Sequence, residues 1–81
     1  MASIRVRLFA QYAELVGQDS VDVEVAAPAT VGDLVDRLRA AHPAAFIPAK
    51  PLVAVNLAQA RRADPVTPGD EVALLPPLAG G

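Results

Sequence analysis

The last two residues of the sequence, Gly80 and Gly81, are the ones best suited to chemistry. Because glycine has no Cβ atom, this pair forms an unbranched end that fits a channel too narrow for other residues. Pro76 and Pro77 lie just before it, and prolines hold the chain extended. Residues 76–81 would span roughly 20 Å when extended. The pattern predicts a slim arm that presents the Gly81 carboxylate to another protein; the alternative is an ordinary frayed terminus.

The side chains exclude several kinds of catalytic and metal site. The sequence has no cysteine, which excludes disulfides, thiolate-bound metals and a nucleophilic thiol. His42 is the single histidine, so neither a histidine metal cluster nor a serine–histidine pair can form. We therefore expect this chain to bind no cofactor and no metal, and any chemistry to involve the terminal carboxyl group.

Length and charge exclude other classes of protein. A chain of 81 residues supports one small domain with one compact core. Its net charge of −2 and scattered arginines give no footprint for nucleic acid. The N-terminus enters a strand pattern directly, and prolines interrupt the least charged stretch, residues 40–60, so no membrane span is expected. These features predict a soluble, cytoplasmic protein that binds neither nucleic acid nor membrane.

Hydrophobic periodicity predicts an α+β fold with one main helix. Residues 3–9 alternate, so that Ile4, Val6 and Leu8 face the core and Phe9 faces away. A helix is expected from a Thr30–Asp33 capping box to the His42-Pro43 stop. The other predicted segments are a helical turn or loop over 11–16, strands over 21–25, 52–55 and 72–75, a weak strand over 57–61, and a turn at 68–70.

This order of elements fits the ubiquitin-like β-grasp fold. We expect one main helix packed on a mixed sheet of four to five strands, with the first and last strands parallel in its middle. Residues 1–75 would form the domain and residues 76–81 a flexible tail. The strand parity also places Phe9 and Leu75 on the open face of the sheet, where they would form one apolar patch for a partner.

Three segments carry a family resemblance over the whole chain. They are LFAQ at 8–11 with ELVG at 14–17, VAVN at 53–56, and GDEVALLPPLAGG at 69–81. Together they resemble the small subunit of molybdopterin synthase, a sulfur-carrier protein of the ubiquitin-like superfamily. The terminal block is the most specific of the three.

The resemblance implies a sulfur-transfer role centred on Gly81. An E1-like adenylating enzyme would use ATP to adenylate the Gly81 carboxylate, and a sulfur donor protein would convert it to a thiocarboxylate. The tail would then enter the large subunit and donate sulfur to a cyclic pyranopterin in molybdenum cofactor biosynthesis. Two carriers are expected on a dimer of large subunits. The chain would be a non-catalytic carrier, because the catalytic groups are expected on the large subunit.

The predicted site has two parts. Gly80 and Gly81 would form the narrow arm, and partner contacts would come from Phe9 and Leu75 of the open-face patch and from Pro76, Pro77, Leu78 and Ala79 of the tail. The sequence is also consistent with three other functions. A sibling carrier for thiazole, cysteine or transfer-RNA thiolation would use the same chemistry with another acceptor. A ubiquitin-like modifier would join its carboxyl group to lysines, and a plain interaction domain would use neither.

Overall fold

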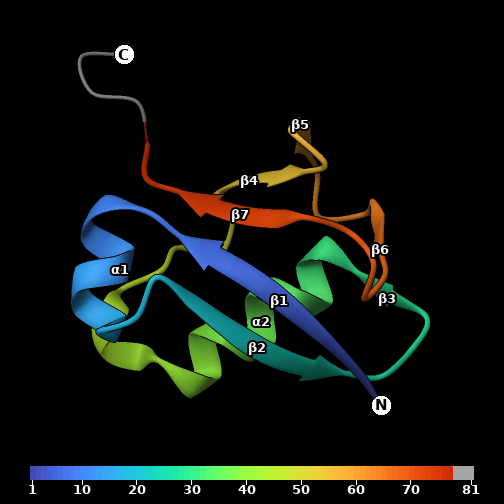
Figure 1. Cartoon of the computed structure of the whole chain (residues 1–81), viewed down its shortest axis with the longest axis horizontal. Coiled ribbons are helices and arrows are strands. Elements are labelled where there is room, and N and C mark those ends of the chain that lie inside the picture. Colours follow the sequence, from blue (N-terminus) through green and yellow to red (C-terminus); the bar gives the residue numbers. More distant parts are fainter. Residues whose placement is uncertain (78–81) are drawn as a thin grey trace.

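The computed structural model describes residues 1–77 and contains a five-stranded sheet with one long helix across one face (Figure 1). Its elements are β1 (Ala2–Leu8), α1 (Ala10–Val16), β2 (Ser20–Val25), β3 (Ala29–Thr30), α2 (Val31–Ala41), a 3-10 turn η1 (Pro43–Ala45), β4 (Leu52–Val55), β5 (Ala58–Ala60), β6 (Pro65–Val66) and β7 (Val72–Leu75). The strands of the large sheet follow the order β2-β1-β7-β4-β5, and β3 pairs with β6 separately. This is the predicted β-grasp arrangement.

The first and last strands lie side by side in the middle of the sheet and run parallel, as predicted. Their register pairs Val6 with Val72 and Leu8 with Leu74, and all four side chains are buried. On the same face lies α2, with its apolar side against the strands. The core is formed by residues such as Ile4, Val6, Leu8, Val72 and Leu74 of the central strands and Leu34, Val35 and Leu38 of α2. Within residues 1–77 no helix is long and apolar enough to cross a membrane.

The main helix begins and ends where the sequence predicts. The Thr30 hydroxyl oxygen accepts from the Asp33 backbone N–H at 3.2 Å, and the Asp33 carboxylate accepts from the Thr30 N–H at 3.0 Å. This reciprocal pair satisfies two backbone donors that the helix itself cannot. His42 forms the C-terminal cap immediately before Pro43. The predicted capping box and stop are therefore both confirmed.

Two features differ from the sequence prediction. The segment expected as a helical turn or loop over 11–16 is a seven-residue helix, α1, that buries Tyr12 and ends at Gly17 with a φ of +86°. Burial of this one large side chain stabilises a helix too short to form alone. The paired strands β3 and β6 were missed, because two-residue strands are too short to show alternation. The division into residues 1–75 and 76–81 stays a prediction.

A hydrogen-bonded network fixes the start of β7. The Asn56 side chain donates to the Asp70 carboxylate at 3.0 Å and accepts from the Glu71 backbone N–H at 2.9 Å. Asp70 also accepts from the Thr67 backbone N–H at 2.8 Å. Asn56 has a φ of +52°, a left-handed value that asparagine adopts more readily than most residues. The hydrogen bonds from Asn56 and then from Thr67 lower the pKa of Asp70 below its ordinary value.

This lowered pKa predicts a loss of stability in acid. Ionised Asp70 stabilises the fold above the ordinary pKa of about 3.8, and the contribution disappears as the pH falls through the lower pKa of the folded state. Asp70→Asn should therefore be less stable than the wild type at neutral pH. Its melting temperature should also fall less steeply between about pH 5 and about pH 2. Thermal melts across this range test the prediction.

Glu24→Gln provides the control, because it removes one carboxylate outside the network. An Asp70→Asn protein whose melting temperature follows the wild-type pH dependence would show that the network adds nothing to stability.

Candidate interaction site at the end of β7

The chain leaves the sheet from the end of its central strand. Leu75 is the last residue of β7, and Leu75 and Pro76 are half-buried whereas Pro77 is exposed. This end of β7 lies beside α1, on the opposite side of the molecule from the N-terminus (Figure 1). Of the predicted site residues, Leu78, Ala79, Gly80 and Gly81 lie outside the described residues, and their roles stay predictions.

Phe9 and Leu75 lie on the sheet face away from α2, as the strand parity predicts. Leu75 pairs with Leu52 of β4, and Ala73 lies between Ala54 of β4 and Arg7 of β1. Phe9 continues β1 by one residue in extended geometry, which places it beside Leu75. Its side chain is 37% exposed. Leu52 and Leu75 are half-buried, so an open apolar row of Phe9, Leu75 and Leu52 crosses the end of the sheet.

Leu52 and Ala54 were not among the predicted contact residues. The strand that holds them is wholly apolar, so alternation could not show which of its side chains face α2. Only the pairing of β4 with β7 shows which side chains of β4 face away from α2. Leu52 lies opposite Leu75 and Ala54 opposite Ala73, so both share the open face with their partners. No partner chain is present, so the contact role of the whole row stays a prediction.

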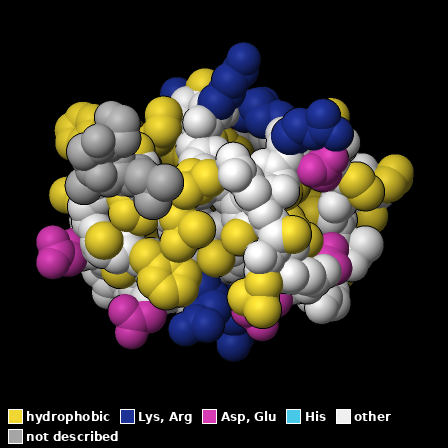
Figure 2. Space-filling view, turned by 90° about the horizontal axis from the view of Figure 1, so that it is seen from above, with side chains coloured by type: hydrophobic (Ala, Val, Ile, Leu, Met, Phe, Trp, Pro, Cys, Tyr) yellow, Lys and Arg dark blue, Asp and Glu magenta, His cyan; other side chains and the backbone are white. Residues whose placement is uncertain are grey.

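A basic side chain orients the aromatic member of this row. The Arg7 guanidinium carbon lies 5.4 Å from the centre of the Phe9 ring, within the range of a cation–π contact. In Figure 2, seen from above, hydrophobic side chains gather in the middle of the visible face, and basic and acidic side chains both lie around them. The site thus combines an apolar centre with charged side chains at its border, which suits a protein contact.

One of the surface hollows adjoins the exit of the chain. It has a volume of about 420 Å³ and is lined by Tyr12, Pro48, Lys50, Pro51, Leu52, Gln59 and Pro77. Burial raises the pKa of Tyr12, so its phenol stays neutral at neutral pH. A larger hollow of about 720 Å³ lies between β2 and α2. Within residues 1–77 no three metal-binding side chains come together.

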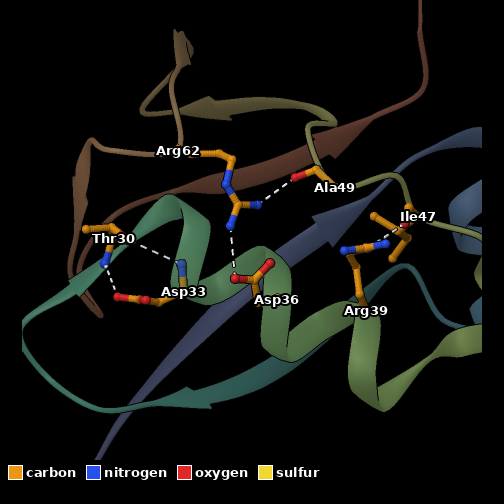
Figure 3. Close-up of polar contacts among 7 residues, drawn as sticks. All are labelled: Thr30, Asp33, Asp36, Arg39, Ile47, Ala49 and Arg62. Atoms are coloured by element: carbon orange, nitrogen blue, oxygen red, sulfur yellow. Dashed lines mark hydrogen bonds and ion pairs between the residues drawn. The ribbon is translucent and has the colours of Figure 1, made fainter.

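Arg62 fixes the loop that carries Lys50 (Figure 3). Its guanidinium donates to the Ala49 carbonyl oxygen at 2.6 Å and to the Asp36 carboxylate at 2.9 Å. Farther along the loop, Arg39 donates to the Ile47 carbonyl oxygen at 2.8 Å. The loop before β4 is thereby tied to α2. Arg62 is thus engaged inside the domain.

The tight contact between Arg62 and Gly32 generates a stability prediction. A Cβ atom at Gly32 would lie 3.1 Å from an Arg62 guanidinium nitrogen, and that group is held by two hydrogen bonds. Gly32→Ala should therefore destabilise the domain by about 1–3 kcal/mol through overpacking. In an Arg62→Ala background the same change should instead stabilise it by about 0.5 kcal/mol, because alanine favours helix. Denaturant unfolding of the four proteins measures both effects.

Additive changes in this double-mutant cycle would contradict the contact. Gly69→Ala is a suitable control, because no atom lies within 4 Å of a Cβ added there.

Comparison with known proteins identifies the family. A model described as the ThiS family matches residues 6–81. The chain belongs to the ThiS family. It is 41% identical over 81 residues to the molybdopterin synthase sulfur carrier subunit of Escherichia coli, covering 96% of this chain and 99% of that one. It is 40% identical over 84 residues to small archaeal modifier protein 1 of Haloferax volcanii, covering 93% and 97%.

Solved structures agree with the family assignment. The crystal structure of small archaeal modifier protein 1 from H. volcanii superposes with a TM-score of 0.85 at 36% identity, over 96% of this chain and all of that one. The β-grasp prediction and the predicted resemblance to the molybdopterin synthase small subunit are thereby confirmed. This ThiS-family chain has relatives that are named as sulfur carriers and a relative that is named as a modifier.

Proposed function

We propose that this ThiS-family chain is the sulfur-carrier subunit of a molybdopterin synthase. The observation that supports it best is the 41% identity to the E. coli carrier subunit over nearly the full length of both chains. The geometry agrees, because the chain exits from the middle of the sheet beside an open apolar row. That arrangement suits a domain that docks on its large subunit while its C-terminus reaches into a partner's active site.

The chemistry follows from the nature of a terminal carboxylate. An α-carboxylate has a pKa of about 3.5 and is a poor electrophile when ionised. An E1-like enzyme would let it attack the α-phosphorus of ATP, which forms the acyl adenylate and releases pyrophosphate. A persulfide sulfur of a donor protein would then attack the acyl carbon and expel AMP. A thiol would attack the donor's sulfur of the resulting acyl disulfide, which leaves a disulfide on the donor and releases the thiocarboxylate. The product is a thiocarboxylate at Gly81, whose sulfur the large subunit would transfer to a cyclic pyranopterin.

The chain's own role in this sequence is to present the reactive group. It supplies no cysteine to hold sulfur and no histidine–serine pair to activate a nucleophile. The proton transfers of the pterin chemistry therefore belong to the large subunit. We propose two carriers on a dimer of large subunits, with ATP used by the activating enzyme and no cofactor bound by this chain.

A free carboxyl group at Gly81 is the central requirement of this proposal. A short tag placed after Gly81 should abolish thiocarboxylate formation, because no terminal carboxylate of glycine remains to be adenylated. Mass spectrometry after incubation with the activating enzyme, ATP and a sulfur donor would detect the exchange of one oxygen for sulfur. The same tag on the N-terminus, which lies at the far side of the molecule, should leave loading unchanged (Figure 1).

Normal sulfur loading of the C-terminally tagged protein would contradict the proposal.

The open apolar row should bind the large subunit through Phe9. Truncation of a central aromatic contact commonly costs about 2 kcal/mol, or roughly thirtyfold in affinity. Phe9→Ala should weaken binding by this amount in titration calorimetry, while a thermal melt shows that the protein stays folded. Phe46→Ala is the matched control, because Phe46 is 81% exposed in a loop outside the row and should not affect affinity.

If Phe9→Ala instead lowers the melting temperature and the folded fraction binds normally, Phe9 is a core residue and the predicted contact is wrong.

A second candidate function is protein modification. The 40% identity to small archaeal modifier protein 1 favours it, since that name describes a modifier. The activation step would be the same, but a lysine amine of a target would attack the adenylate, lose a proton and expel AMP to form an isopeptide bond. Incubation of the carrier with the activating enzyme, ATP and cell proteins distinguishes the two functions. Thiocarboxylate alone supports the carrier, and covalent adducts on lysines support the modifier.

A further inference from the structure

We propose that the partner of the open face carries acidic side chains on both sides of an apolar socket, placed to meet Arg7 and Arg61. The inference rests on the proposed function, because it assumes that this face docks on the large subunit. It adds the chemistry of the partner surface, which the apolar row alone does not specify. Three observations support it. They are which basic side chains already form hydrogen bonds or ion pairs, where the other basic side chains lie, and where the acidic side chains lie.

The basic side chains divide into two groups. Four arginines donate hydrogen bonds from their side chains: Arg5 to Asp22, Arg37 to the Glu24 carbonyl oxygen, Arg39 to the Ile47 carbonyl oxygen, and Arg62 to Ala49 and Asp36. These side chains serve the fold. Within residues 1–77, Arg7, Lys50 and Arg61 make no side-chain hydrogen bond and no ion pair to a carboxylate. Their charges are therefore available to a partner.

The available cations lie around the open apolar row. Arg7 is paired with Ala73 on one side of β7 and contacts the Phe9 ring. On the other side, β4 pairs Val53 with Ala60, so the next position places Arg61 beside Leu52. Arg61 directly follows β5, whose last residue, Ala60, packs against the core, and successive residues of an extended chain point to opposite faces. Arg61 therefore faces the open side.

Lys50 extends the positive border toward the exit of the chain. It lines the hollow of about 420 Å³ together with Leu52 and Pro77, and its side chain is exposed. Arg7, Arg61 and Lys50 thus come from three separate segments that the fold brings to one end of the sheet. Their separation in sequence explains why no basic run was visible there.

The nearby acidic residues do not pair with these cations. Asp22 is paired with Arg5 toward the far end of β1, and Glu71 and Asp70 precede β7. The Asp64 carboxylate accepts from the backbone N–H of Arg61 at 2.8 Å, and the Asp19 backbone carbonyl accepts from the Leu8 N–H at 2.8 Å. Within residues 1–77 neither carboxylate forms an ion pair with the guanidinium of Arg7 or Arg61. Opposite charges across an interface speed association and exclude wrong partners, so an acidic border on the partner fits best.

Association kinetics with the large molybdopterin synthase subunit of the same genome test the inference. Arg7→Gln/Arg61→Gln should lower the association rate constant about tenfold at low salt, and the difference from wild type should shrink at high salt. Ala40→Glu/Ala44→Glu is the matched control. It makes the same change of net charge at exposed positions of α2 and η1, and it should associate much as the wild type does.

Arg61→Gln alone removes the ambiguity that Arg7 also orients Phe9. It should slow association in the same direction, about threefold, with an unchanged melting temperature. Equal association rates for wild type, Arg61→Gln and the double variant at low salt would overturn the inference while binding itself stands. A slowing of the same size in the Ala40→Glu/Ala44→Glu control would also overturn it, because net charge alone would then explain the effect. A wild-type carrier that does not bind the large subunit at all would instead overturn the proposed function.

Discussion

The parallel pairing of β1 with β7 is the constraint on which the rest of the structure depends. It joins the first and last strands of the chain in the middle of one sheet. The register sets Val6 beside Val72 and Leu8 beside Leu74, so the apolar residues of both strands meet under α2. A slip of β1 by one residue along β7 would turn Arg7 toward the helix and expose Val6 and Leu8. The same pairing makes the chain leave from the centre of the sheet.

This constraint divides the sheet into two faces with different tasks. The face under α2 holds the side chains whose burial stabilises the domain, since apolar burial is the main driving force of folding. The opposite face carries short or half-exposed residues such as Ala54, Ala73 and Leu75. Residues on the open face can therefore vary to fit a partner at little cost to the fold.

The sequence predicted the elements whose signals are local. The alternation of Ile4, Val6 and Leu8 and the Thr30–Asp33 capping box each specify their structure within a few residues. The sequence did not reveal features that depend on contacts between residues far apart in the chain. Helix α1 depends on the burial of Tyr12 by the rest of the core, and the β3–β6 pair depends on backbone bonds between distant segments. The open-face position of Leu52 likewise follows only from its pairing with Leu75.

The candidate site was predicted in part for the same reason. Strand parity was sufficient to place Phe9 and Leu75 on the open face. The sequence could not separate the roles of Arg61 and Arg62. Adjacent residues on an extended chain point in opposite directions, but the sequence does not show which of the two points toward α2. In the structure one reaches Asp36 of α2 and the other faces the open side. Of the two adjacent arginines, Arg62 therefore stabilises the fold, and Arg61 leaves its charge available to a partner.

The composition of the chain is consistent with a protein that presents an activated carboxyl group. An acyl adenylate reacts with any thiol or amine that reaches it. Under the proposed function a carrier with few nucleophiles of its own is less exposed to reaction with itself. The sequence contains no cysteine and only one lysine, and arginine supplies nearly all of its positive charge. Guanidinium groups stay protonated in proteins and bind anions without attacking them. Arg7 and Arg61 thus make the border of the docking face positive without adding amines to the one that Lys50 places beside Pro77.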